Sequence, residues 1–237
     1  MNRVRREYGL PSLGFDLRRV YTDADYTLYA DTPEMLPTFG LPDHHRYLGP
    51  IIWSPAVNLP EWWKRLPIDK PILYVTLGSS GPASLLEVVC EALADMPVIV
   101  IAATAGRCKP GRVPPNAFLA EYLPGNEAVR RAALVICNGG SPTSHQALAA
   151  GVPVLGLATN LDQHLNMQAV CRSGAGIMLR SGRLQPETCR AAVHQLLSQR
   201  RYSMGAQQVA VNFSRYSAAE RFQHLVDEIL CPVEIKT

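Results

Sequence analysis

The chain has 237 residues, of which 47% are hydrophobic and 18% are charged, and its formal net charge at pH 7 is +3. This composition is typical of a globular protein with one large core or two modest ones, and so weak a positive charge does not favour nucleic acid as a partner. No apolar stretch of the sequence is long enough to predict a transmembrane segment. The basic first residues have no apolar segment behind them, so we expect a cytoplasmic protein without a signal peptide.

The first 70 residues contain few periodic elements. Residues 4–19 are compatible with a helix and a loop, and residues 26–30 with a strand. Eight prolines follow between residues 33 and 71, and among them lie three tryptophans, Trp53, Trp62 and Trp63. This pattern indicates an extended connection rather than a complete domain. We expect the adjacent tryptophans to be packing anchors for that connection.

From residue 71 onward, short apolar runs alternate with segments of helical spacing. The apolar runs predict strands at residues 72–77, 98–103, 117–123, 134–137, 153–158 and 177–179. The helical segments are residues 83–96, 127–133, 143–150, 161–172 and 186–199, with one or two further helices in residues 202–230. Short apolar strands alternating with helices predict a parallel sheet covered on both faces, that is, an α/β fold of the Rossmann-like kind.

Six cysteines are scattered along the chain without a C-x-x-C pair, at Cys90, Cys108, Cys137, Cys171, Cys189 and Cys231. Most of them fall in expected strands or helices among apolar neighbours. Reduced thiols of a cytosolic protein are the expected state, and the spacing favours neither a zinc site nor a disulfide framework.

The most informative stretch runs from Asn138 to Gln163. A predicted strand leads into Gly139 and Gly140, and small hydroxyl residues then open a helical segment. A helix start offers unpaired N–H groups and a positive dipole end, and glycine lets a ligand approach the backbone, so this pattern predicts a phosphate cradle. Asp162 and Gln163 follow the next predicted strand and carry acceptor oxygens for sugar hydroxyls. Together these features predict a nucleotide-sugar site at the carboxyl ends of the strands.

The same stretch resembles the nucleotide-sugar-binding half of the UDP-glycosyltransferases of GT-B fold, especially the bacterial macrolide-type glycosyltransferases. Their signature reads roughly H-G-G-x-G-T-x-x-E-A-L-x-x-G-V-P, followed by D-Q-x-x-N. The matching residues of this chain are Gly139, Gly140, Thr143, Ala147, Leu148, Gly151, Val152, Pro153, Asp162, Gln163 and Asn166. The resemblance extends over residues 71–230.

The resemblance implies a division of the chain. Residues 1–70 would be the tail of an N-terminal acceptor-binding domain and a proline-rich interdomain connection. Residues 71–230 would form the nucleotide-sugar-binding domain, and residues 231–237 a C-terminal tail. The family's general base belongs to the N-terminal domain, of which this chain holds only the end. We therefore assign no catalytic residue.

The resemblance also implies binding roles. The nucleotide and its diphosphate would contact Gly78, Ser79, Ser80, Tyr122, Leu123, Asn138, Gly139, Gly140, Ser141, Thr143 and Gln146. Asp162 and Gln163 would bind the sugar. No metal ion and no cofactor is implied, because the donor substrate itself would be a UDP-sugar or a dTDP-sugar. The acceptor would be a small molecule or a lipid.

Some positions depart from the family pattern. Asn138 stands where the family usually has a diphosphate-binding histidine, and Gln146 where it has a glutamate that accepts from the ribose. Both residues are neutral here, so they can form hydrogen bonds but contribute no charge. Pro142 replaces a glycine at a position where a helix start tolerates proline. Gly125 replaces a glutamine often found beside the base.

Three functions remain open. The first is an inverting glycosyltransferase, incomplete in this chain, that moves a hexosyl group to a hydroxyl of a lipid-like or natural-product acceptor. The second is a non-catalytic or split-enzyme nucleotide-sugar-binding subunit that needs a partner chain with the N-terminal domain. The third is a nucleotide-sugar epimerase, against which the Asp-Gln pair and the G-V-P link argue.

Several residues also have plainer interpretations. The Gly78–Gly81 loop could be only a tight β–α turn, and Asp162 could be the cap of the helix that begins there. We expect solvated-loop, surface or groove-lining positions rather than catalytic ones for His44, His45, His145 and His164.

Overall fold

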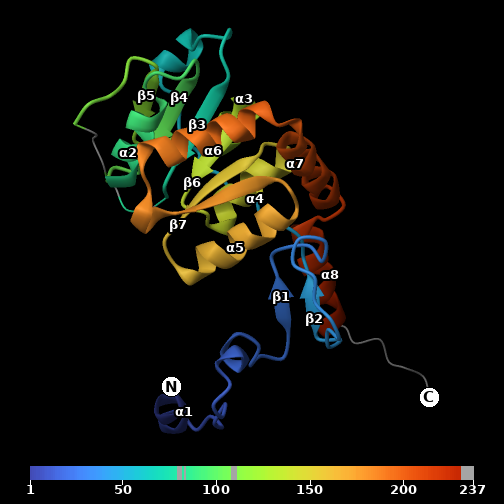
Figure 1. The fold of residues 1–237 in the computed structure, drawn as a ribbon. Helices are drawn as coiled ribbons and strands as arrows, with labels where there is room; N and C mark the ends of the chain where they lie inside the picture. The colour runs from blue at the N-terminus through green and yellow to red at the C-terminus, as the bar shows by residue number, and fades with distance from the viewer. Residues whose placement is uncertain (79–81, 83, 108–110, 231–237) are drawn as a thin grey trace. The chain divides into compact units, whose positions relative to one another are not determined.

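The structure is a computed structural model that describes residues 1–78, 82, 84–107 and 111–230. The chain divides into two compact units (Figure 1). Unit 1 comprises residues 1–49 and the chain from residue 216 onward, and unit 2 comprises residues 50–215. The proline-rich connection from residue 50 therefore groups with the sheet, and the last helix groups with the N-terminal residues.

Unit 2 is built on a six-stranded parallel sheet with the strand order β5-β4-β3-β6-β7-β8. The strands are β3 (Ile72–Thr76), β4 (Ile99–Ala103), β5 (Ala117–Ala120), β6 (Ala132–Cys137), β7 (Val154–Ala158) and β8 (Gly176–Arg180). Side chains of the central strands are buried on both faces of the sheet, which is why the sequence shows continuous apolar runs there. The predicted Rossmann-like α/β fold is confirmed.

Helices cover both faces of this sheet (Figure 1). They are α2 (Ser84–Leu93), α3 (Gly125–Arg131), α4 (Ser141–Ala149), α5 (Leu161–Arg172), α6 (Pro186–Ser198) and α7 (Arg200–Phe213). On one face α2 packs with α6, and on the other α3, α4 and α5 follow one another, with α7 packed on α4. A short helix, η3 (Ser181–Arg183), follows β8. No helix in the described part of the chain is both long and apolar enough to cross a membrane.

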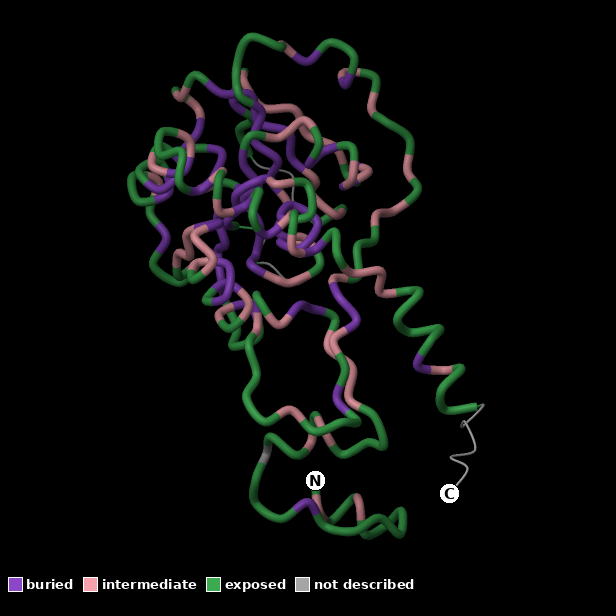
Figure 2. The backbone as a smooth tube through the Cα atoms, turned by 90° about the vertical axis from the view of Figure 1, so that its right-hand side faces the viewer, coloured by how far each residue is buried: buried purple, intermediate pink, exposed green. Residues whose placement is uncertain are grey.

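The core of unit 2 lies in the sheet and on the inner faces of its helices, where the chain is continuously buried (Figure 2). Its largest fully buried side chains include Leu73, Leu93, Ile101, Leu134, Ile136, Leu148, Leu155 and Leu157. Burying one such side chain contributes about 1.5–3 kcal/mol. This core fixes the strand ends from which the loops of the candidate site leave.

The connecting segment, residues 50–70, contains one short helix, η2 (Glu61–Arg65). Trp63 is buried, and the guanidinium carbon of Arg131 lies 5.1 Å from the centroid of its ring. Trp62 donates from Nε1 to the Leu119 carbonyl at 3.3 Å. Both tryptophans thus hold the segment on unit 2, and the expectation that they are packing anchors is confirmed.

Unit 1 contains α1 (Asn2–Glu7), η1 (Leu17–Tyr21), β1 (Thr27–Tyr29), β2 (His45–Tyr47) and α8 (Ala218–Leu230). The strands β1 and β2 pair in parallel. The strand β2 was not expected from the sequence, because its three polar and aromatic residues show no apolar alternation. His45 is buried there, with Nδ1 at 2.9 Å from the Tyr29 hydroxyl, so a solvated-loop position is wrong for this histidine.

Gly205, inside α7, packs closely against the backbone of Gly174. Alanine usually stabilises a helix interior over glycine by about 1 kcal/mol. Here a Cβ at position 205 would lie 2.6 Å from the carbonyl carbon and oxygen of Gly174, which are backbone atoms. We therefore expect Gly205→Ala to lower the free energy of unfolding in urea by about 1–3 kcal/mol. The control is Gly182→Ala, where the new Cβ meets nothing within 4 Å; a more stable Gly205→Ala would contradict the close packing.

Candidate functional site

The strand order of unit 2 reverses between β3 and β6. The chain runs outward from β3 to β4 and β5, and then returns to β6 on the other side of β3. In open parallel sheets, ligands bind beyond the carboxyl ends of the strands at such a reversal. The loops that leave β3 and β6 there contain Gly78 and Asn138. They lie close together, because a Cβ added at Gly78 would be 3.2 Å from the Asn138 amide nitrogen.

The glycine turn, residues 138–140, joins β6 to α4. Gly139 has a φ of +83°, a left-handed conformation that glycine adopts without strain. A Cβ at this position would also lie 2.8 Å from Cγ of Met167. Asn138 is buried, and its Oδ1 accepts from the Gly140 N–H at 3.1 Å. The Asn138 side chain therefore shapes the turn, and its predicted contact with a diphosphate stays a prediction.

The helix α4 begins directly after the glycine turn. Gly140 is its N-cap residue, and among the described residues no side chain caps it. The first N–H groups of an α-helix have no partner within the helix. Pro142 lies in the first turn, where a proline costs no intrahelical hydrogen bond, as expected. Ser141 and Thr143 are half-buried on the same turn. A helix start of this kind has the donors that the predicted phosphate cradle would require.

The helix α5 is fastened to the glycine turn by Asn166. Its Nδ2 donates to the Gly139 carbonyl at 2.7 Å and to the Ser144 hydroxyl at 2.8 Å. The Ser144 hydroxyl in turn lies 3.0 Å from the Gly140 carbonyl. Asn166 matches the family signature, but the signature alone does not indicate these two contacts. The nearest signal for them was the Asp-Gln-x-x-Asn spacing, which puts Asn166 one turn after Asp162.

The two predicted sugar-binding residues, Asp162 and Gln163, have different environments in the first turn of α5. Asn160 is the cap, because its Oδ1 accepts from the Gln163 N–H at 3.0 Å. The capping interpretation of Asp162 is therefore wrong, and this carboxylate lies exposed in the first turn. Gln163 is buried, and its Oε1 accepts from the Thr159 N–H at 2.8 Å and from the Thr159 hydroxyl at 2.7 Å. A sugar hydroxyl would compete with Thr159 for that oxygen.

The remaining predicted nucleotide contacts divide between two other places. Tyr122 and Leu123 follow β5, and of the two only Tyr122 is exposed. Gln146 is buried on α4, on a side covered by the connecting segment. Ser79 and Ser80 lie outside the described residues. Gly78 thus lies beside the glycine turn that leads into α4, whereas Gln146 is buried and has little exposure to solvent.

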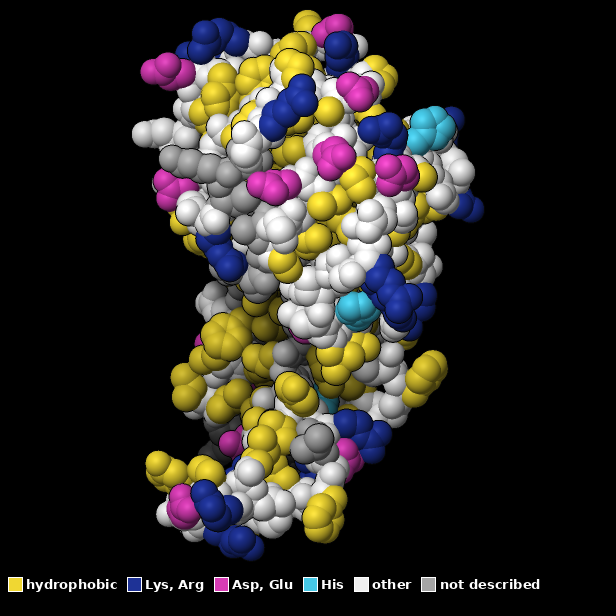
Figure 3. All heavy atoms as spheres, turned by 60° about the vertical axis from the view of Figure 1, so that its left-hand side comes forward, with side chains coloured by type: hydrophobic (Ala, Val, Ile, Leu, Met, Phe, Trp, Pro, Cys, Tyr) yellow, Lys and Arg dark blue, Asp and Glu magenta, His cyan; other side chains and the backbone are white. Residues whose placement is uncertain are grey.

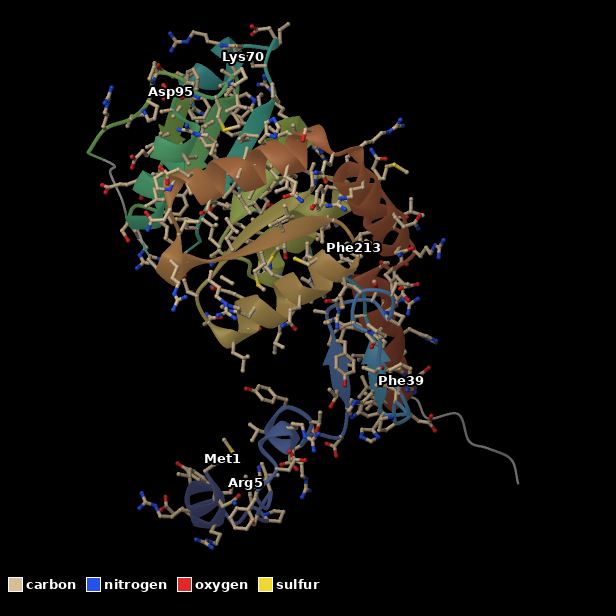
Figure 4. The ribbon with its side chains drawn as sticks, in the orientation of Figure 1. Met1, Arg5, Phe39, Lys70, Asp95 and Phe213 are labelled. Atoms are coloured by element: carbon tan, nitrogen blue, oxygen red, sulfur yellow. The ribbon has the colours of Figure 1, made fainter. Side chains whose placement is uncertain are left out.

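The two histidines beside the motifs differ in their burial. His145 is buried on α4, and its ring lies 5.4 Å from that of Phe213, in an edge-on arrangement between α4 and α7 (Figure 4 labels Phe213). The expected surface or groove-lining role is therefore wrong for His145. His164 is half-buried, with Nδ1 at 2.7 Å from the Asn160 carbonyl.

Cys137, at the end of β6, lies next to the glycine turn. Burial raises the pKa of its thiol to about 12, although the Gly139 N–H, at 3.3 Å from the sulfur, acts in the opposite direction. The thiol is therefore protonated at neutral pH and does not act as a nucleophile. Among the residues that the structure describes, no group of three or more His, Cys, Asp or Glu side chains is arranged to hold a metal ion.

Asn166 gives a direct test of how the glycine turn is held. Asn166→Asp keeps the shape of the side chain but replaces the donor by a carboxylate, which cannot donate to the Gly139 carbonyl. We expect the free energy of unfolding in urea at pH 7 to fall by about 1–3 kcal/mol. Gln168→Ala, an exposed position on the same helix, is the control. An Asn166→Asp variant as stable as the original chain would show that these two hydrogen bonds do not hold the turn.

Known proteins resemble this chain in sequence and in fold. It is 60% identical over 213 residues to a PGL/p-HBAD biosynthesis glycosyltransferase of Mycobacterium tuberculosis, covering 90% of this chain and 50% of that protein. It is 56% identical over 215 residues to a PGL/p-HBAD biosynthesis rhamnosyltransferase of Mycobacterium bovis, covering 91% of this chain and 48% of that protein. The chain thus spans about half the length of the curated relatives it matches.

Among solved structures, the spinosyn rhamnosyltransferase SpnG complexed with thymidine diphosphate matches the fold of this chain with a TM-score of 0.73. The sequences are 22% identical, and the match covers 95% of this chain and 60% of that one. This likeness shows the fold, that of a GT-B glycosyltransferase C-terminal domain.

The family model described as "Erythromycin biosynthesis protein CIII-like, C-terminal domain" matches residues 85–227. This range is more than half of the chain and contains the glycine turn, α4 and α5. The resemblance to the nucleotide-sugar-binding half of the macrolide-type glycosyltransferases is confirmed. The chain belongs to the family of erythromycin biosynthesis protein CIII-like C-terminal domains.

Proposed function

We propose that this chain is the nucleotide-sugar-binding half of an inverting glycosyltransferase of the cytoplasm. The donor is a UDP-sugar or a dTDP-sugar, no cofactor is used, and the hexosyl group passes to a hydroxyl of a small-molecule or lipid-like acceptor. The observation that carries the proposal is the glycine turn, which lies at the strand-order reversal and opens on the uncapped start of α4. The relatives named as a glycosyltransferase and a rhamnosyltransferase support the same reaction class.

The reaction requires stabilisation of a departing diphosphate. An acceptor oxygen attacks the anomeric carbon, and the bond from that carbon to the diphosphate oxygen breaks, so negative charge develops on the nucleoside diphosphate. The first N–H groups of α4, with the hydroxyls of Ser141 and Thr143, are donors placed to receive this charge. The Asn138 amide can add a hydrogen bond but no positive charge.

We assign the binding of the sugar and the removal of the acceptor hydroxyl's proton to groups other than the start of α4. Asp162 is exposed in the first turn of α5, which the Asn166 hydrogen bonds fasten to the glycine turn. We assign its carboxylate to the sugar hydroxyls, for which it is a charged acceptor. A general base must lie within hydrogen-bond reach of the acceptor hydroxyl whose proton it removes. Because we assign the acceptor to an N-terminal domain, we assign the base to that domain as well.

A second candidate function is a sugar-nucleotide-binding subunit that works only with an N-terminal partner. The observation that favours it is the two-stranded parallel sheet of unit 1, since parallel sheets usually belong to larger sheets that are buried on both faces. Unit 1 also exposes several large apolar side chains, among them Tyr8, Phe15, Tyr21 and Phe39, and hydrophobic side chains are prominent on the face in Figure 3. On either candidate, nucleotide binding is a property of unit 2.

Calorimetric titration tests both candidates. We expect UDP or dTDP to bind the purified chain, and Asp162→Ala to weaken the binding of the corresponding sugar nucleotide by about ten- to hundredfold, since a hydrogen bond to a charged group contributes about 1.5–3 kcal/mol. The affinity for the free nucleoside diphosphate should change little, and Gln168→Ala should change neither. Equal weakening of both ligands would remove Asp162 from the sugar site. No binding of either nucleotide at millimolar concentration would contradict both candidate functions.

A product assay distinguishes glycosyl transfer from nucleotide-sugar binding alone. With a sugar nucleotide and a small-molecule or lipid acceptor, we expect the chain alone to release little glycosylated product, because the acceptor-binding wall and the base are assigned to an N-terminal domain. Joining it to the N-terminal half of the 60%-identical relative should raise turnover. Full turnover by the chain alone would contradict the placement of the base outside it.

A further inference from the structure

Gln146 does not face open space, although the family signature places a ribose-binding glutamate at its position. Its Nε2 donates to the Trp53 carbonyl at 3.1 Å and to the Asn126 Oδ1 at 2.9 Å. The side chain is only 6% exposed. Both hydrogens of the carboxamide are therefore used inside unit 2. A glutamate here would bring carboxylate oxygens against two acceptor oxygens, which it could not pair with.

The other side of this carboxamide lies against Gly125. A Cβ at position 125 would lie 2.3 Å from Oε1 and 2.8 Å from Nε2 of Gln146. The carboxamide thus fills the space that a side chain at position 125 would need. Gly125 and Gln146 both depart from the family pattern, and their contact makes the two departures one packing arrangement.

This arrangement holds the backbone of the connecting segment at residues 53–54. Gln146 binds the carbonyl of Trp53, and the hydroxyl of Ser54 accepts from the Asn126 N–H at 3.4 Å. Asn126 lies in the first turn of α3, at the carboxyl edge of the sheet. Tyr122, in the loop that leads into α3, is 50% exposed, and Trp53 is 73% exposed. The backbone at Trp53 is thus held beside the same end of α3 into which the loop with Tyr122 leads.

An exposed indole on a fixed backbone is suited to stacking. A tryptophan offers a large rigid face at low entropic cost, and stacking of a base on an aromatic side chain tolerates any base. Tyr122 already occupies the position that the resemblance implies for an aromatic residue near the base. The carbonyl of Trp53 accepts a hydrogen bond from the buried Gln146, whereas the residue as a whole is largely exposed to solvent.

We propose that Trp53 is a nucleobase-stacking residue of the donor site, and that Gln146 is the positioning residue that holds it there rather than a ribose ligand. The proposal rests on the proposed function, since it concerns the nucleoside end of the same site. It assigns a binding role to the connecting segment. It also explains why a glutamine with both amide hydrogens engaged replaces a carboxylate.

The test is a double-mutant cycle on the affinity for UDP and dTDP, measured by calorimetry. Trp53→Ala should weaken both nucleotides by about tenfold through lost stacking. Gln146→Ala should weaken them by a smaller factor, and the double variant should bind like Trp53→Ala alone, because Gln146 acts through Trp53. Phe39→Ala, another exposed aromatic position, is the control and should leave the affinities unchanged.

Other outcomes would overturn the proposal. Unchanged affinity in Trp53→Ala would remove the stacking role. Additive losses in the double variant, or tighter nucleotide binding by Gln146→Glu, would show that residue 146 contacts the nucleotide directly. If the unmodified chain binds neither nucleotide, the proposed function itself fails, and with it the stacking role.

The positioning role has a readout that needs no nucleotide. Hydrogen exchange at the backbone amides of residues 51–57 and of Asn126 should become faster in Gln146→Ala than in the unmodified chain. The thermal midpoint should fall in Gly125→Ala, because the new Cβ meets the carboxamide, but should not fall further when the same change is made in Gln146→Ala. Unchanged exchange, or an equal fall in both backgrounds, would contradict the positioning role.

Discussion

The pair of hydrogen bonds from Asn166 to the Gly139 carbonyl and the Ser144 hydroxyl is the constraint on which the candidate site depends. It ties α5 to the glycine turn and to the first part of α4. Because the same helix carries Asp162 in its first turn, these hydrogen bonds link the proposed sugar acceptor to the proposed diphosphate donors. Rigid placement of donors before the reaction is what makes such a site effective at stabilising developing charge.

The sequence predicted the architecture of unit 2 well because its signals there are local. Continuous apolar runs predicted the buried parallel strands, and α5 was expected at its observed bounds, between the polar residues after β7 and the glycine after its end. The position of the glycine turn was equally predictable. A Gly-Gly pair between a buried strand and a helical segment is typical of a tight turn that leads into a helix N-terminus.

The sequence predicted side-chain roles less well, because these depend on contacts between distant segments. Gln146 meets Trp53, which belongs to a segment without periodicity, and no local pattern predicts that pairing. His145 lies on a helix that is buried on nearly all sides by the sheet and by α7, so its place on α4 does not distinguish a groove from a core. The short strand β2 was missed because two of its three side chains are polar.

The two neutral replacements have different physical meanings. At position 138 an asparagine keeps a donor beside the turn, and the family's histidine would be a group that titrates near neutral pH. The proposed diphosphate subsite would therefore rely on the N–H groups and dipole of α4, whose strength does not change with pH. At position 146 the carboxamide is engaged with backbone and side-chain acceptors, so its neutrality is required by packing. In the proposed donor site, the first replacement would change the electrostatics, whereas the second would add the connecting segment to the lining of the site.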